Sequence, residues 1–216
     1  MQITNNTNLT DSLVNFLDTG LRTLFGKPVI TDRANPAEKI RCLTHLSDLE
    51  HQKSVGFMRV NHCGEVCAQA LYQGQALTAS DPAIKFKLQT AALEENDHLN
   101  WCQTRLTQLN SHSSYLNPIW YAGSLSIGTI AGLAGDRYNL GFLAETEKQV
   151  SKHLAEHLQK LPLKDYESRV IIKQMYQDEQ AHAQTAINAG AYHLHPLVKY
   201  TMRLSAKIMT TVAYYI

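Results

Sequence analysis

A lone glutamate followed further along the chain by a Glu-x-x-His pair occurs twice in this sequence. The first set is Glu65, Glu95 and His98, and the second is Glu147, Glu179 and His182. The offset between the lone glutamates, 65 to 147, nearly equals that between the pairs, 95 to 179, so the sets repeat one half-site. In a four-helix bundle, one Glu from each of two helices and Glu-x-x-His from each of the other two hold a carboxylate-bridged di-iron or di-manganese centre. The six residues are therefore predicted metal ligands for two iron ions, with manganese the less favoured metal, and they leave open positions for O₂.

Neighbouring acidic residues compete for two of these positions. Glu145 and Glu147 point about 200° apart on a helix, so only one of them can face the core. We prefer Glu147 because it matches the repeat, and Glu95 over Glu94 because Glu95 has His98 three residues on.

Further polar residues lie near the predicted ligands in sequence. Asp178 is a candidate partner for a ligating histidine, which commonly donates its second N–H to a carboxylate. Two interpretations of His153 stay open, a role in electron or proton transfer and a plain polar residue. No other catalytic residue and no organic cofactor site is predicted.

The spacing predicts two helical hairpins that bring the ligands level. In the first half, the stretch 65–79 that ends the first helix is nearly as long as the stretch 82–95 that begins the next. In the second half, the stretches 147–160 and 165–179 match in the same way, on either side of a break at 161–164. At ~1.5 Å per residue in both directions, the carboxylates of each hairpin reach the same height.

Length and composition predict one domain over residues 1–216, with its core at about 47–190. The net charge of +1 gives no reason to expect a nucleic-acid partner. The first residues lack the basic start and apolar run of a signal peptide. No pair among the four cysteines, Cys42, Cys63, Cys67 and Cys102, forms Cys-x-x-Cys, which argues against a zinc ribbon or thioredoxin-type site. Free thiols and the missing leader favour the cytoplasmic side of the cell.

Apolar residues recur mostly at three and four positions, which predicts an all-α fold. We expect six helices, four of them forming the bundle, over about residues 11–24, 47–78, 82–109, 118–160, 165–189 and 196–216. The fourth should break near Gly135, and the first and last are short amphipathic helices. Residues 35–43 are expected to form a connector, and no motif is recognisable in the stretch before about residue 43.

Two segments suggest contact with a membrane surface. Residues 118–135 carry no charge before Asp136 but are too short and too rich in Gly, Ser and Thr for a transmembrane span. In the segment 196–216, Lys199, Arg203 and Lys207 form a basic stripe beside apolar residues, as in helices that lie on anionic membranes. A core helix and an ordinary surface helix are the alternatives. We expect a peripheral protein on the cytoplasmic side of the cell membrane.

Four segments resemble the 5-demethoxyubiquinone hydroxylases, also named 2-polyprenyl-3-methyl-6-methoxy-1,4-benzoquinone monooxygenases, of the ferritin-like di-iron carboxylate superfamily. The most specific is Val60-Asn61-His62-Cys63-Gly64-Glu65, and the others surround Glu95, Glu147 and Glu179. The resemblance covers about residues 55–190. It implies a ferritin-like bundle whose six ligands carry iron.

The resemblance also implies a reaction, the O₂-dependent hydroxylation of a lipophilic polyprenyl benzoquinol ring in ubiquinone biosynthesis. NADH is an implied reductant, and other ubiquinone-biosynthesis proteins are implied partners. Some family members have a His-Tyr pair implicated in electron entry; the corresponding pair here is His153-Leu154, so His153 matches and Leu154 departs.

Other functions use the same ligands or the same bundle. A ferritin- or bacterioferritin-like ferroxidase or iron-storage protein would form a large hollow shell. A di-manganese catalase would disproportionate peroxide. A metal-free lipid-binding or scaffold bundle is disfavoured, because burying unneeded carboxylates is costly.

Overall fold

The structure is a computed structural model that describes residues 9–31, 33–40 and 45–216. These residues form seven α-helices and no strand, which confirms the all-α prediction. The helices are α1 (Leu9–Phe25), α2 (Asp48–Thr78), α3 (Pro82–Gln108), α4 (Asn117–Leu133), α5 (Asp136–Lys160), α6 (Tyr166–Asn188) and α7 (Pro196–Ala213). Cys42 and the last part of the expected connector, residues 41–43, lie outside the described residues.

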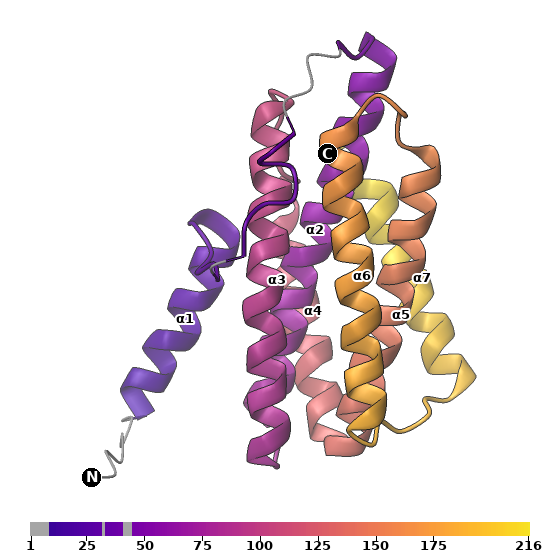
Figure 1. The fold of residues 1–216 in the computed structure, drawn as a ribbon. Helices are drawn as coiled ribbons and strands as arrows, with labels where there is room; N and C mark the ends of the chain where they lie inside the picture. Colours follow the sequence, from indigo (N-terminus) through magenta and orange to yellow (C-terminus); the bar gives the residue numbers. More distant parts are fainter. Residues whose placement is uncertain (1–8, 32, 41–44) are drawn as a thin grey trace.

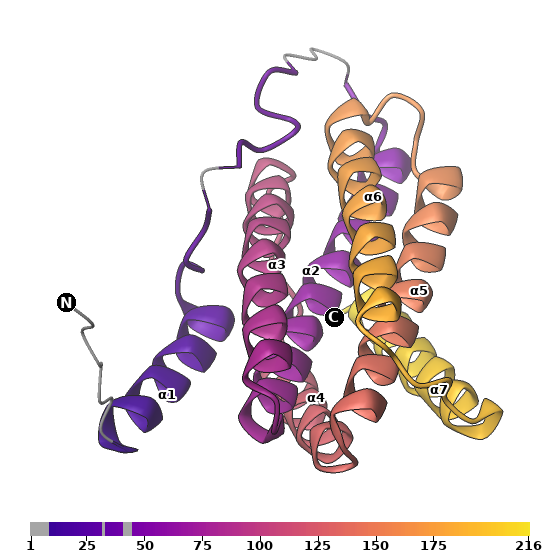
Figure 2. The ribbon, with the colours of Figure 1, turned by 60° about the horizontal axis from the view of Figure 1, so that its bottom comes forward.

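Helices α2, α3, α5 and α6 form an upright bundle of two hairpins, α2–α3 and α5–α6 (Figure 1). Local sequence determines where three of these helices begin. Ser47 and Glu50 form a reciprocal capping box at α2, Asp81 with Pro82 starts α3, and the Asp165 carboxylate accepts a hydrogen bond from the Ser168 N–H at α6. The turned view in Figure 2 shows α1 at one side of the bundle and α7 crossing α5 obliquely on the other.

The segment expected as a single helix over 118–160 is two helices, so the predicted count of six was wrong. The division falls at the expected place, because Gly135 has φ 106°, a left-handed conformation that favours glycine. Helix α4 folds back against α2, where a Cβ at Gly128 would collide with the Leu71 carbonyl oxygen. Close backbone packing by glycine therefore positions α4 outside the four-helix core.

Two apolar clusters fill the bundle, one toward each end. The first contains Met58, Trp101, Leu106, Leu154, Ile172 and Met175. The second contains Tyr72, Leu88, Leu140, Leu143 and Ala186. On each of the four helices, the predicted metal ligands fall between the residues of the first cluster and those of the second. The polar side chains thus form one layer with apolar packing on both sides.

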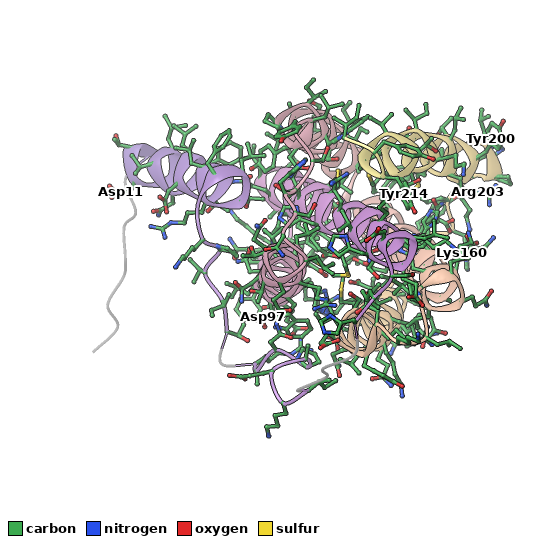
Figure 3. The ribbon with its side chains drawn as sticks, turned by 90° about the horizontal axis from the view of Figure 1, so that it is seen from above. Asp11, Asp97, Lys160, Tyr200, Arg203 and Tyr214 are labelled. Atoms are coloured by element: carbon green, nitrogen blue, oxygen red, sulfur yellow. The ribbon has the colours of Figure 1, made fainter. Side chains whose placement is uncertain are left out.

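Helices α1, α4 and α7 lie outside the core and share one side of the bundle, away from α6 (Figure 3). Leu24 of α1 packs against the apolar cluster that contains Tyr121 of α4, and Trp120 of α4 and Met209 of α7 both pack against the cluster around Val60. Each helix also exposes large apolar side chains, namely Leu13, Leu17 and Leu21, then Ile119, Ile130 and Leu133, then Leu197, Leu204 and Ile208. No helix in the described part of the chain is long and apolar enough to cross a bilayer.

Candidate metal centre

All six residues of the predicted repeat meet in the middle layer of the bundle. Glu65 comes from α2, Glu95 and His98 from α3, Glu147 from α5, and Glu179 and His182 from α6. Five of the side chains are buried, and His182 is the more accessible member, with its side chain 12% exposed. Residues from both halves of the chain therefore converge as the matched hairpins require.

The six side chains form two overlapping groups. One group is Glu65, Glu95, His98 and Glu179, and the other is Glu95, Glu147, Glu179 and His182. Within each group the potential ligand atoms all lie within 4.8 Å of one another. Glu95 and Glu179 belong to both groups, so these two carboxylates would be shared if two metal ions were bound, while each group keeps one further Glu and one His.

Several buried polar atoms of this layer make no well-aligned hydrogen bond, although some of them lie close to an oppositely charged group. They are Oε1 of Glu95, Oε1 of Glu147, Oε2 of Glu179 and Nδ1 of His182. A buried polar atom without a partner usually costs ~1–3 kcal/mol, so such atoms are rare unless something else satisfies them. Carboxylate oxygens and imidazole nitrogens are donors that iron accepts, and the layer therefore fits a pair of metal ions.

The electrostatics show how closely the acidic groups are held. Burial raises the pKa of Glu65, and the neighbouring Glu95 carboxylate raises it further. Burial likewise raises the pKa of Glu147, together with the Glu179 carboxylate. For His182, burial would lower the pKa, but the Glu179 and Glu95 carboxylates, which lie 3.5 and 3.1 Å from its Nδ1, raise the pKa to about 12. In the metal-free protein, protons thus occupy positions from which metal ions would displace them.

Both histidines turn one ring nitrogen inward and the other toward a second carboxylate. His98 Nδ1 lies 2.8 Å from Glu95 Oε2, and its Nε2 lies 2.9 Å from Asp178 Oδ2. His182 Nε2 lies 2.7 Å from Glu94 Oε2. A proton on each Nε2 would leave each Nδ1 free to bind metal.

The expected Asp178–histidine contact is present, but the role of Glu94 was missed. Glu94 and Asp178 occupy equivalent positions, each directly before the glutamate of its own helix that both ligand groups share. Each contacts the histidine of the opposite hairpin. Applying the repeat to these outer residues as well as to the ligands would have identified the Glu94 contact.

The structure separates the remaining candidates from the six. Glu145 faces α7, where its carboxylate lies 3.2 Å from Lys199 Nζ, so Glu147 faces the core as expected. His153 lies on α5 beside His157, with ring centroids 6.3 Å apart, and is not in either ligand group. Its proposed part in electron or proton transfer therefore stays a prediction.

A helical bundle with two carboxylate- and histidine-rich half-sites that share two glutamates has the residue pattern of the dinuclear metal-carboxylate class of proteins. The chain belongs to the family of ubiquinone biosynthesis protein COQ7, whose model matches residues 52–213. The resemblance noted from the sequence is thereby confirmed.

Curated relatives agree with this family. Proteins from Acinetobacter baumannii and Acinetobacter baylyi, each named 3-demethoxyubiquinol 3-hydroxylase, are 52% identical over 206 residues, 95% of this chain and 97% of each relative. A protein of the same name from Coxiella burnetii is 55% identical over 196 residues, 91% of this chain and 90% of the relative. The chain is thus a hydroxylase of ubiquinone biosynthesis, and the monooxygenase prediction is confirmed in preference to iron storage.

Proposed function

We propose that this protein hydroxylates the ring of a demethoxyubiquinol that carries a polyprenyl tail, using O₂ and two iron ions held by Glu65, Glu95, His98, Glu147, Glu179 and His182. The substrate is taken from the names of the relatives. The observation that carries the proposal is the pair of ligand groups sharing two buried carboxylates. In the overall reaction one oxygen atom enters the ring C–H bond and the other leaves as water. Two electrons and two protons are consumed, with NADH as the proposed source of electrons.

When bound, the iron ions would supply the redox chemistry that activates O₂. The protein positions the ligands, balances the charge of the ions and excludes water from the site. Four glutamates provide negative charge to balance two divalent cations. Asp178 and Glu94 orient the two imidazoles. The apolar clusters around Trp101 and Tyr72 exclude water from both ends of the layer. Exclusion of water strengthens every electrostatic interaction inside the layer.

We propose that the exposed apolar residues of α1, α4 and α7 rest on the cytoplasmic surface of the cell membrane, where the lipophilic substrate resides. These helices share one side of the bundle in Figure 3, which labels Tyr200 and Arg203 at its α7 end. Arg203 and Lys207 are exposed and suit anionic headgroups, whereas Lys199 pairs with Glu145. Amphipathic helices with apolar and basic residues bind membrane surfaces without crossing them.

Sedimentation with anionic phospholipid vesicles tests the membrane proposal. Wild-type protein should sediment with the vesicles, and Ile130→Glu on α4 should remain in the supernatant. A change of similar size at Leu163→Glu, which is exposed but lies in the α5–α6 connection, serves as the control. Wild-type protein that does not sediment with the vesicles would contradict the proposal. The apolar face would then be expected to bind another protein of ubiquinone biosynthesis.

Mass spectrometry of the quinones in a strain lacking this gene tests the reaction. The demethoxy precursor should accumulate, and the wild-type gene should restore ubiquinone. Glu179→Ala should fail to restore it, whereas Glu156→Ala, which changes a partly exposed glutamate paired with Lys160, should succeed. A normal ubiquinone pool in a strain without a redundant enzyme would refute the proposed function.

A further inference from the structure

The segment after α1 crosses α3 and is fixed there by a buried carboxylate. The backbone N–H of Thr31 donates to Asp97 Oδ1 at 2.8 Å, and the Thr31 hydroxyl donates to Asp97 Oδ2 at 2.6 Å. Asp97 is completely buried, so these bonds satisfy both oxygens of a carboxylate inside the protein. Figure 3 labels Asp97 beside α3, on the side where this segment passes. We refer to the described residues 27–31 and 33–40 as the strap.

Arg33 extends the strap from α3 to α6. Its guanidinium forms an ion pair with the Asp178 carboxylate on α6. The same guanidinium lies 5.1 Å from the centre of the Trp101 ring on α3, within the range of a cation–π contact. The strap therefore joins the two helices that carry the Glu-x-x-His pairs, although these helices belong to different hairpins.

The Asp178 carboxylate links Arg33 to His98, one of the six predicted ligands. One carboxylate oxygen of Asp178 contacts both Arg33 and His98 Nε2, and the other accepts a hydrogen bond from Gln174 at 2.9 Å. Arg33 and Gln174 leave the carboxylate little freedom to rotate. A carboxylate held in this way fixes the ring orientation of His98 and the nitrogen that carries the proton.

The carboxylate that contacts His182 is held less firmly than the one that contacts His98. The Glu94 side chain that contacts His182 is 39% exposed, against 16% for Asp178. The described contacts include no guanidinium bonded to Glu94. The two half-sites are thus alike in their ligands but differ in the groups that hold their histidines.

We propose that Arg33 is a positioning residue for the metal centre, which acts through Asp178 to present Nδ1 of His98 to one of the two metal ions. The inference rests on the proposed function in that the six residues are taken as ligands. It goes beyond the family match, because that match begins at residue 52 and the strap lies before it. In this proposal the strap helps to orient a ligand of the metal centre, although it lies outside the four-helix bundle.

Anaerobic titration of the metal-free protein with Co²⁺, followed by its absorption spectrum, tests this role without requiring turnover. Arg33→Ala should weaken one of the two Co²⁺ sites about 10- to 100-fold, the usual effect of losing a residue that supports a ligand. It should also change the spectrum of that site and leave the other site near its wild-type affinity. Arg33→Lys, which keeps the charge, should recover part of the lost affinity.

Two controls separate positioning from general damage. Arg22→Ala removes an exposed Arg–Asp pair on α1 and should leave both Co²⁺ affinities unchanged. In an Asp178→Asn background, Arg33→Ala should have little further effect, because both changes interrupt the same connection. Wild-type affinity at both sites in Arg33→Ala, equal weakening of both sites, or fully additive effects with Asp178→Asn would overturn the inference. A wild-type protein that binds no Co²⁺ would refute the metal centre itself, and this role with it.

Discussion

Replacing Glu147 with glutamine should stabilise the metal-free protein while removing a metal ligand. Glu147 is only 2% exposed, and its Oε1 has no hydrogen-bond partner. Burial raises the pKa of this carboxyl, and the nearby Glu179 carboxylate raises it further, so its ionised form is disfavoured. Glutamine has nearly the same shape but does not ionise, so it removes the free-energy cost of protonating this carboxyl when the chain folds.

The size of the effect follows from the environment of the side chain. Burial holds the pKa of Glu147 well above its ordinary value of 4.5, so keeping the carboxyl protonated in the folded protein costs about 1.4 kcal/mol for each pH unit above 4.5. At about pH 6 the glutamine variant should therefore gain about 2 kcal/mol in unfolding free energy. For a chain of this length, that corresponds to a rise of about 4–8 °C in Tm. With metal present the order should reverse, because ligand at 100 times its Kd stabilises the folded state by about 2.7 kcal/mol and the variant loses this contribution.

Thermal unfolding with and without Fe²⁺ under anaerobic conditions, combined with metal analysis, measures both effects. Glu145→Gln is the matched control, since Glu145 is two residues away on α5 but pairs with Lys199 and Gln149 outside the metal layer. The control should bind two metal ions and show no rise in Tm. A Glu147→Gln protein that is less stable than wild type without metal, or that still binds two ions, would refute the reasoning.

Three further outcomes concern the fold. Burial lowers the pKa of His157 from 6.5 to about 3. Between these pH values the unfolded chain protonates His157 and the folded protein does not, so the stability of the fold decreases as the pH drops from 6.5 toward 3. His157→Gln should reduce this slope by up to about 1.4 kcal/mol per pH unit in urea unfolding of the metal-free protein between pH 6 and 4. Arg105→Ala leaves the buried Asp165 carboxylate at the start of α6 without its charged partner and should lower the unfolding free energy by ~3–5 kcal/mol. A loss below ~1 kcal/mol would contradict this reasoning. Gly128→Val should lower it by ~1–3 kcal/mol through collision with Leu71, whereas Gly123→Val, which meets open space, should not.

Much of the bundle could be predicted because local signals and the ligand repeat agree. Ser47, Asp81 and Asp165 are strong helix-start residues, and the helices they cap begin within one residue of the expected starts at 47, 82 and 165. The break near Gly135 was expected, but the way in which α4 folds back against α2 was harder to foresee. It depends on how closely α4 approaches α2 after the turn at Gly135, and packing between helices does not follow from periodicity alone.

The predicted ligands could be identified from the sequence, whereas most of the residues that surround and support them could not. The convergence of the six predicted ligands follows from residue type and spacing, because a helix face fixes which side chains can converge. The contacts of Arg33 and Thr31 could not be predicted, because the strap has no periodic pattern and its partners on α6 and α3 are distant in sequence. Contacts between an irregular segment and a helix depend on the tertiary fold.

The most direct test of the central claim is isotope labelling of the hydroxylation product. Purified iron-loaded protein would be supplied with a demethoxyubiquinol, a reductant and ¹⁸O₂, and the quinol product analysed by mass spectrometry. The new ring hydroxyl should carry ¹⁸O in the wild-type protein and in Glu145→Gln, and no product should form in Glu179→Ala. A ring oxygen derived from water, or equal product from Glu179→Ala, would contradict an O₂-dependent hydroxylase built on these six residues.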